Sequence, residues 1–152
     1  MTKANSIYLD DILAAQPSSK GCRESAGPAR RVLVMDDEEA VCNVIGSILA
    51  TMGCLADMTK NGEAALASYI KAKSRGVPFD AVILDLHVSR GMNGRETMKK
   101  LLEFDPDVKA VVTSGDFTDP WITDFRVFGF KEALPKPFRP AELKKALLPL
   151  LH

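Results

Sequence analysis

Acidic, hydroxyl and amine side chains stand at the ends of short apolar runs in this sequence. Asp36 and Asp37 follow VLVM, Asp85 follows AVIL, Thr113 ends AVVT, and Lys136 precedes a proline. If each run is a strand of one parallel sheet, the carboxyl ends of the strands meet at one edge and bring these side chains together. The expected site therefore combines carboxylates, a hydroxyl and an amine.

The carboxylates predict a metal site. Like charges held close together disfavour ionisation unless a cation joins them. Carboxylate oxygens without a nearby cysteine or histidine cluster suit a hard ion, and a site with one or two direct carboxylates suits Mg²⁺ better than Ca²⁺. Adjacent side chains leave a strand on opposite sides, so we expect one of Asp36 and Asp37 to bind directly and the other through water. Taken alone, the DDEE run is also typical of a helix N-terminus.

Asp85 is the candidate nucleophile. It ends a continuous apolar run and precedes a glycine-bearing loop, which leaves its carboxylate at the sheet edge. A carboxylate beside a metal can attack phosphorus and form an aspartyl phosphate, whose oxygens the metal neutralises. Thr113 would then donate its hydroxyl to a phosphate oxygen, and Lys136 would pair with another. Each of these residues alone is an ordinary cap, turn or surface residue, so the prediction depends on the full set.

Alternating apolar and amphipathic segments predict five βα units. The expected strands are 32–35, 55–58, 81–84, 110–113 and 133–134, and the expected helices are 41–49, 64–70, 96–103, 121–127 and 140–148. Several strand runs are continuously apolar, which is typical of strands that helices cover on both faces. The expected fold is therefore a three-layer α/β sandwich around a parallel sheet.

Composition narrows the function classes. The chain of 152 residues has 46% hydrophobic residues, and no apolar run is long enough to span a bilayer. With 20 basic and 20 acidic residues it has no net charge, which gives no electrostatic basis for binding nucleic acid or a membrane surface. The first residues lack the apolar core of a signal peptide, which predicts a cytoplasmic protein. The 3 cysteines match no metal-ligand spacing and are expected to be reduced thiols.

A linker is predicted before the first strand. Residues 16–30, QPSSKGCRESAGPAR, are rich in Ser, Gly and Pro and have no hydrophobic period. We therefore expect residues 1–29 to form a flexible leader and linker, and residues 30–152 to form one folded domain.

Residues 30–152 resemble a response-regulator receiver domain of two-component systems. The matching segments, in the family's order, are VLVMDDEE, VILDLHVSRGMNG, VVTSG and LPKPF. The resemblance implies a flavodoxin-like (βα)5 fold with strand order 2-1-3-4-5. It also implies a signalling switch that accepts a phosphoryl group from the phosphohistidine of a histidine kinase or of a histidine phosphotransfer domain.

The resemblance also implies a role for each site residue. Asp85 would be the phosphoacceptor and would bind Mg²⁺ together with Asp37 and the backbone carbonyl of His87. Asp36 would act largely through metal-bound water. Thr113 would hydrogen-bond the phosphoryl group in the active state.

For the lysine, the resemblance implies a pairing with the phosphoryl group. A cis peptide bond between Lys136 and Pro137 would aim the side chain of Lys136 back into the site.

Three positions depart from the commonest family pattern. The loop after the acceptor aspartate has one extra residue before Gly94 and has Ser89 where a proline is frequent, as in receivers attached to hybrid sensor histidine kinases. Ala133 stands where many receivers carry an aromatic residue. Together with SIYL in the leader, which is similar to the last strand of a kinase ATP-binding domain, the loop favours a receiver from the C-terminal end of a hybrid kinase over a free-standing regulator.

The same residues bear on other functions. A haloacid dehalogenase-type phosphohydrolase needs Asp-x-Asp-x-Thr after the first strand, whereas this strand ends in MDDEEA, and a nucleotide-binding protein would need a Gly-rich phosphate loop. A phosphorylation-independent interaction module with the receiver fold stays open as the alternative, as does a homodimer. His87 has no partner carboxylate specified by the sequence and is interpreted as a solvent-facing loop residue.

Overall fold

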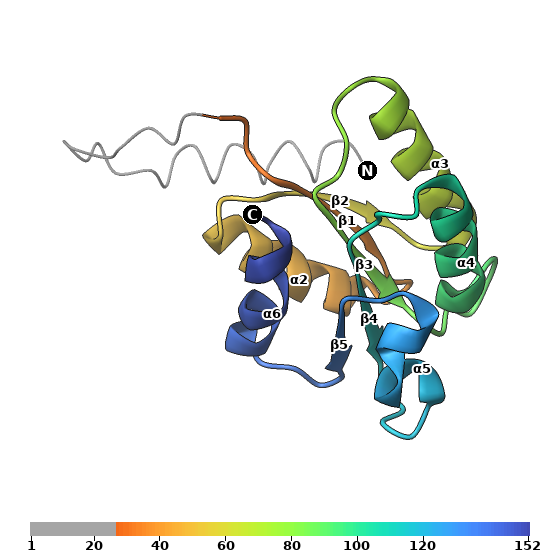
Figure 1. Ribbon diagram of the computed structural model, residues 1–152. Helices are drawn as coiled ribbons and strands as arrows, with labels where there is room; N and C mark the ends of the chain where they lie inside the picture. Colours follow the sequence, from red (N-terminus) through yellow and green to blue (C-terminus); the bar gives the residue numbers. More distant parts are fainter. Residues whose placement is uncertain (1–26) are drawn as a thin grey trace.

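Strands and helices alternate along residues 27–152, which are the residues that the computed structural model describes (Figure 1). The five strands are β1 (Arg31–Met35), β2 (Leu55–Thr59), β3 (Ala81–Asp85), β4 (Ala110–Ser114) and β5 (Glu132–Pro135). The helices are α2 (Glu39–Thr51), α3 (Gly62–Ser74), α4 (Gly94–Phe104), α5 (Pro120–Thr123) and α6 (Pro140–Leu147). Short 3₁₀ turns, η1 (Phe125–Phe128) and η2 (Leu148–Leu150), follow the last two helices.

All five strands pair in parallel, in the order β2-β1-β3-β4-β5. This order confirms the predicted flavodoxin-like sheet. The order reverses between β1 and β3, which are neighbours in the sheet although β2 lies between them in the sequence. Ligands of open parallel sheets bind beyond the carboxyl ends of the strands at such a switch point, so the topology places the site between β1 and β3.

Helices cover both faces of the sheet and make a three-layer sandwich (Figure 1). In β3, Ala81 and Ile83 pack into the core beneath α2 and α6, whereas Val82 and Leu84 pack into the core beneath α3, α4 and α5. Every residue of β3 and β4 is buried, which explains their continuous apolar character. Each fully buried aliphatic side chain contributes about 1.5–3 kcal/mol, so the central strands form a rigid base for the residues at their ends.

The helix between β4 and β5 differs from the sequence prediction of one helix over 121–127. The structure has the single turn of α5, capped by the Asp119 side chain, and then η1. The Trp121 ring stacks on Phe128 with a centroid distance of 4.0 Å. Gly129, with a φ of 93°, then ends the segment. The segment therefore forms one α-helical turn and a 3₁₀ turn joined by an aromatic stack, and not the single regular helix that the apolar spacing predicted.

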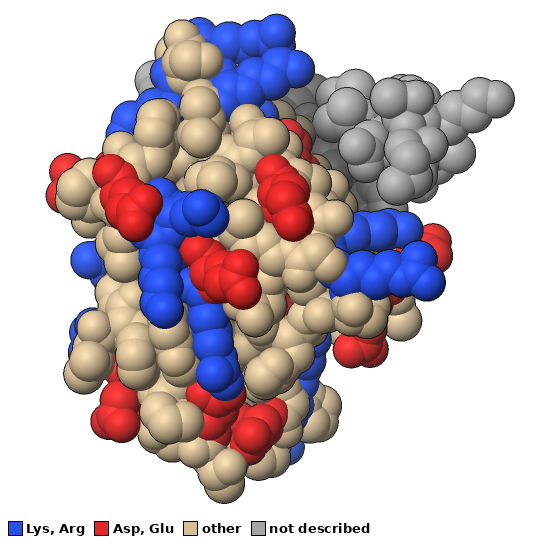
Figure 2. All heavy atoms as spheres, turned by 90° about the vertical axis from the view of Figure 1, so that its right-hand side faces the viewer, with Lys and Arg blue, Asp and Glu red and all other residues tan. Residues whose placement is uncertain are grey.

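The face formed by the α3, α4 and α5 side carries Lys and Arg side chains interspersed with Asp and Glu (Figure 2). Neither sign of charge dominates this view, in keeping with the zero net charge of the chain. In the part of the chain that the structure describes, no helix is long and apolar enough to cross a membrane. The predicted leader and linker over residues 1–29 lies, up to residue 26, outside the described residues, as does Cys22.

Candidate functional site

Asp85 ends β3 at the carboxyl edge of the sheet and is only 3% exposed. In the strand register it lies opposite Thr113 of β4, which is also buried. The chain then turns sharply, and a Cβ atom at Gly94 would collide with the backbone oxygen of Asp85. The glycine at the start of α4 therefore lets the helix approach the strand end, and the predicted juxtaposition of Asp85 and Thr113 is present.

Lys136 brings the last strand into the same site. Its Nζ atom lies 2.8 Å from Oδ2 of Asp36 and 3.1 Å from Oδ2 of Asp85. The peptide bond between Lys136 and Pro137 is cis, which confirms the expectation drawn from the family resemblance. One ammonium group thus lies between two buried carboxylates that come from different strand ends.

Burial and charge act in opposite directions on these groups. Burial raises the pKa of Asp85, the negative charge of Asp36 raises it further, and the Lys136 ammonium opposes both effects. Burial lowers the pKa of Lys136, but its hydrogen bonds and charge interactions with Asp36 and Asp85 raise it more strongly. The lysine therefore stays positively charged and supplies the positive potential that an incoming phosphoryl group needs.

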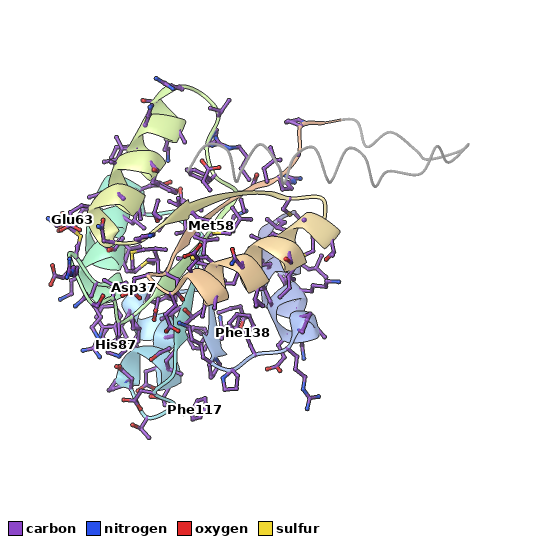
Figure 3. The ribbon with its side chains drawn as sticks, turned by 180° about the vertical axis from the view of Figure 1, so that it is seen from behind. Asp37, Met58, Glu63, His87, Phe117 and Phe138 are labelled. Atoms are coloured by element: carbon purple, nitrogen blue, oxygen red, sulfur yellow. The ribbon has the colours of Figure 1, made fainter. Side chains whose placement is uncertain are left out.

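Asp37 points to a different neighbour. Its Oδ2 atom accepts hydrogen bonds from the backbone N–H and from the hydroxyl of Ser89, both at 2.7 Å. These bonds, the backbone one first, lower the pKa of Asp37. Asp37 and His87 lie on neighbouring loops at the carboxyl edge of the sheet (Figure 3). The sequence contains no signal for the contact between Asp37 and Ser89, because it depends on the path of the loop after β3.

His87 is joined to the acceptor carboxylate by its backbone. Its N–H donates to Oδ1 of Asp85 at 3.2 Å, and its side chain places Nε2 at 3.6 Å from Oδ2 of Asp119. Asp119 is buried, and the guanidinium of Arg95 also pairs with it. The His87 side chain is 58% exposed, as expected for a loop residue, but it has a carboxylate partner that the sequence interpretation lacked.

The oxygen atoms at this edge can hold a divalent cation. One carboxylate oxygen from each of Asp36, Glu38 and Asp85 lies within 4.8 Å of the others. Glu38 was not among the predicted ligands, although the DDEE run contains it. The nearby Cys42 donates its thiol to the carbonyl of Asp36, and burial, followed by the charge of Asp36, raises its pKa to about 11. The thiol therefore stays protonated, and the all-oxygen donor set fits Mg²⁺.

The comparison with protein families matches residues 32–148 to the response regulator receiver domain. Among curated proteins, the chain is 35% identical over 112 residues to the chemotaxis protein CheY of Treponema pallidum, covering 73% of this chain and 75% of that protein. It is 28% identical to the CheY of Thermotoga maritima, covering 78% of this chain and 94% of that protein. It is also 28% identical to hybrid signal transduction histidine kinase L of Dictyostelium discoideum, of which it covers 7%.

Solved structures share the fold. CheY in the CheX-CheY-BeF3-Mg²⁺ complex of Borrelia burgdorferi matches with a TM-score of 0.73 and 23% identity, covering 86% of this chain and 95% of that one. The receiver domain of the sensor histidine kinase PA1611 of Pseudomonas aeruginosa, with a magnesium ion in its active-site cleft, matches with a TM-score of 0.71 and 18% identity, covering 82% and 98%.

Proposed function

This chain belongs to the response regulator receiver family and is a phosphoacceptor switch of two-component signalling, and we propose that Asp85 is its phosphorylation site. One observation carries the assignment. The Asp85 carboxylate lies at the carboxyl end of the central strand with an ammonium group at 3.1 Å and a second buried carboxylate on the far side of that ammonium. A nucleophile, a counter-charge and oxygen ligands for a cation are thus present at one point.

Phosphoryl transfer at this site needs little covalent chemistry from the protein. A carboxylate oxygen of Asp85 forms the new bond to phosphorus, while the bond from phosphorus to the imidazole nitrogen of the donor phosphohistidine breaks and that nitrogen takes up a proton. Lys136 pairs with a phosphoryl oxygen as negative charge moves toward Asp85. Thr113, opposite Asp85 in the register, donates its hydroxyl to another oxygen.

Receiver domains bind Mg²⁺ in their active site, and the described carboxylates fit that ion. We propose that Asp85, Asp37 and the carbonyl of His87 would bind the ion directly and that Asp36 would act largely through water. The ion would neutralise charge on the transferring oxygens. Glu38, whose Oε1 atom lies 3.9 Å from Nζ of Lys136, belongs to the same acidic group and would add negative charge beside the ion.

Receiver domains exchange phosphoryl groups with histidine kinases and histidine phosphotransfer proteins. For this chain we propose a phosphohistidine donor of either kind, within a hybrid kinase rather than in a free-standing regulator. Because such donors are made from ATP, the proposal places the chain in the cytoplasm. The balanced charge supports a protein partner over nucleic acid or a membrane surface.

Intact mass measurement after incubation with acetyl phosphate tests the proposal. With Mg²⁺ present, the wild-type chain should gain one phosphoryl group, and it should gain none with the ion chelated. Asp85→Asn should gain none in either condition. A fully folded wild-type chain that gains no mass would favour the alternative, a phosphorylation-independent interaction module.

A further inference from the structure

Ser89 binds Asp37 in a way that the common family pattern does not allow. The serine donates both its backbone N–H and its hydroxyl to one oxygen of Asp37, each at 2.7 Å. A proline, frequent at this position in receivers that this chain resembles, has neither donor. The contact is therefore a property of this chain and not of the receiver fold.

Asp37, which makes this contact, stands apart from the other carboxylates. The oxygens of Asp36, Glu38 and Asp85 gather within 4.8 Å of one another, and Asp37 is not a member of that cluster. To bind a cation directly, the ionised Asp37 carboxylate would have to give up its two hydrogen bonds from Ser89. Such charge-assisted bonds are roughly twice as strong as neutral ones, so the exchange weakens the net affinity for the ion.

The far end of the loop is anchored separately. Met92 donates its N–H to Oε2 of Glu63 at 2.8 Å, and its carbonyl accepts from the N–H of Gly62 at 2.8 Å. Gly91, with a φ of 83°, lies directly before this anchor. The loop is therefore fixed to α3 at Met92 and to β1's carboxyl end at Ser89, and Asp37 can leave Ser89 without breaking the anchor at Met92.

We propose that Ser89 competes with Mg²⁺ for Asp37, so that this chain binds the ion more weakly than it would with proline at position 89. Ser89 is thus a positioning residue that sets the metal concentration at which the switch becomes competent. Binding of the ion releases the Ser89 end of the loop, which couples metal occupancy to the surface around His87. The inference rests on the proposed role of Asp37 as a direct ligand.

Calorimetric titration with MgCl₂, in the absence of a phosphodonor, measures the effect directly. Ser89→Ala removes one donor and should tighten Mg²⁺ binding about threefold. Ser89→Pro removes both donors and should tighten it about tenfold, which corresponds to about 1.4 kcal/mol. In an Asp37→Ala background the Ser89→Ala substitution should have no effect, because the side chain for which Ser89 and the ion compete is gone.

A matched control is available in the loop after β4. Thr118 donates its N–H and hydroxyl to Oδ1 of Asp116, at 2.9 Å and 2.7 Å, so one carboxylate oxygen again accepts both donors of one residue. Thr118→Ala should leave the Mg²⁺ affinity unchanged.

The results separate this inference from the proposed function. If the chain is phosphorylated at Asp85 but Ser89→Ala and Ser89→Pro bind Mg²⁺ with unchanged or weaker affinity, Ser89 does not compete for Asp37 and the inference is wrong. If no variant binds Mg²⁺ and none is phosphorylated, the proposed function fails and the inference fails with it.

Discussion

The surroundings of the buried Asp85 carboxylate disfavour its ionised form. Burial and the neighbouring Asp36 both raise its pKa above the ordinary aspartate value, and the Lys136 ammonium only partly offsets them. A group whose pKa is higher in the folded than in the unfolded state destabilises the fold once it is ionised. The ionised, reactive form of Asp85 therefore lowers the free energy of unfolding.

Asp85→Asn should therefore stabilise the protein at neutral pH, by an amount on the order of 1 kcal/mol, the scale of a typical single substitution. The folded state binds the proton more tightly, so wild-type stability falls as pH rises from the unfolded pKa of about 3.9 to the folded pKa. The advantage of the variant should appear over that range and vanish below it. Urea unfolding at several pH values measures the difference in stability. A variant less stable than wild type at pH 7 would contradict the inference that ionised Asp85 destabilises the fold.

Residue types and strand ends were enough to predict that Asp36, Asp85 and Lys136 converge, because parallel strands end at one edge. The cis bond before Pro137 followed from the family resemblance. The contact between Asp37 and Ser89 could not be predicted, because it depends on the path of a loop with one extra residue. The partnership of His87 with Asp119 was missed for a similar reason, since the two residues lie on loops after different strands.

The loop after β3 and the start of α4 pack against the acceptor strand at Gly94. A methyl group there would collide with the backbone of Asp85, so Gly94→Ala should destabilise the fold by about 2 kcal/mol or more and slow phosphorylation. Gly115 is a matched control, because no atom lies within 4 Å of a Cβ built on it. Equal unfolding free energies for Gly94→Ala and Gly115→Ala would show that the close approach is not a constraint.

Asp119 connects the loop after β4 with His87 in the loop after β3. Its Oδ2 atom pairs with His87 and Arg95, while its Oδ1 atom accepts from the N–H of Trp121 at 2.9 Å. Ala133 has no ring to rotate, so a phosphoryl group should act on the output surface through these loops. A ligand shifts a two-state equilibrium only by its differential affinity for the two states, so we expect the contacts of Asp119 to differ between the unphosphorylated and phosphorylated forms.

Amide chemical shifts with and without beryllofluoride and Mg²⁺ test this coupling. We expect large changes over residues 86–93 and 114–123, including Phe117 and Trp121. Asp119→Asn keeps an oxygen to cap α5 but loses the charge, and it should reduce the change at Trp121 by at least half. Changes concentrated at Ala133 and α6, with both loops unchanged, would contradict the prediction.

At the level of elements, the strands were the most predictable part, because continuous apolar runs such as those of β3 and β4 indicate burial on both faces. The prediction of one continuous helix over 121–127 was wrong, because this segment forms a short α-helix and then a 3₁₀ turn. Its apolar spacing is real, but Trp121 stacks on Phe128 and the chain turns at Asp124, so tertiary packing has overridden the periodic pattern. A local sequence pattern cannot predict a contact of this kind between side chains.

Two hydrophobic cores on opposite faces of the sheet hold the described residues together, and hydrogen bonds near residue 30 join the N-terminal ends of the central strands. Arg31 donates its N–H to Oδ2 of Asp80 at 2.8 Å, and the carbonyl of Arg30 accepts from Leu55 at 2.8 Å. Both contacts lie within residues 27–152. Arg30 and Arg31 therefore join the N-terminal end of β1 to those of β2 and β3.

Deletion of residues 1–26 should accordingly change the free energy of unfolding by less than about 0.5 kcal/mol and leave phosphorylation intact. The linker over residues 16–30 lacks the apolar spacing needed to offset the entropy of ordering. Denaturant unfolding and the acetyl phosphate assay check both parts. An unfolded truncated chain would move the domain boundary toward the N-terminus.

Locating the phosphoryl group on the chain tests the central claim most directly. Borohydride reduction of the phosphorylated protein converts the acceptor aspartate to homoserine, which tandem mass spectrometry of the peptides can place. The account predicts homoserine at position 85 alone, formed only when Mg²⁺ is present during phosphorylation. Homoserine at position 36 or 37, or none at 85 in a chain that has gained phosphoryl mass, would contradict it.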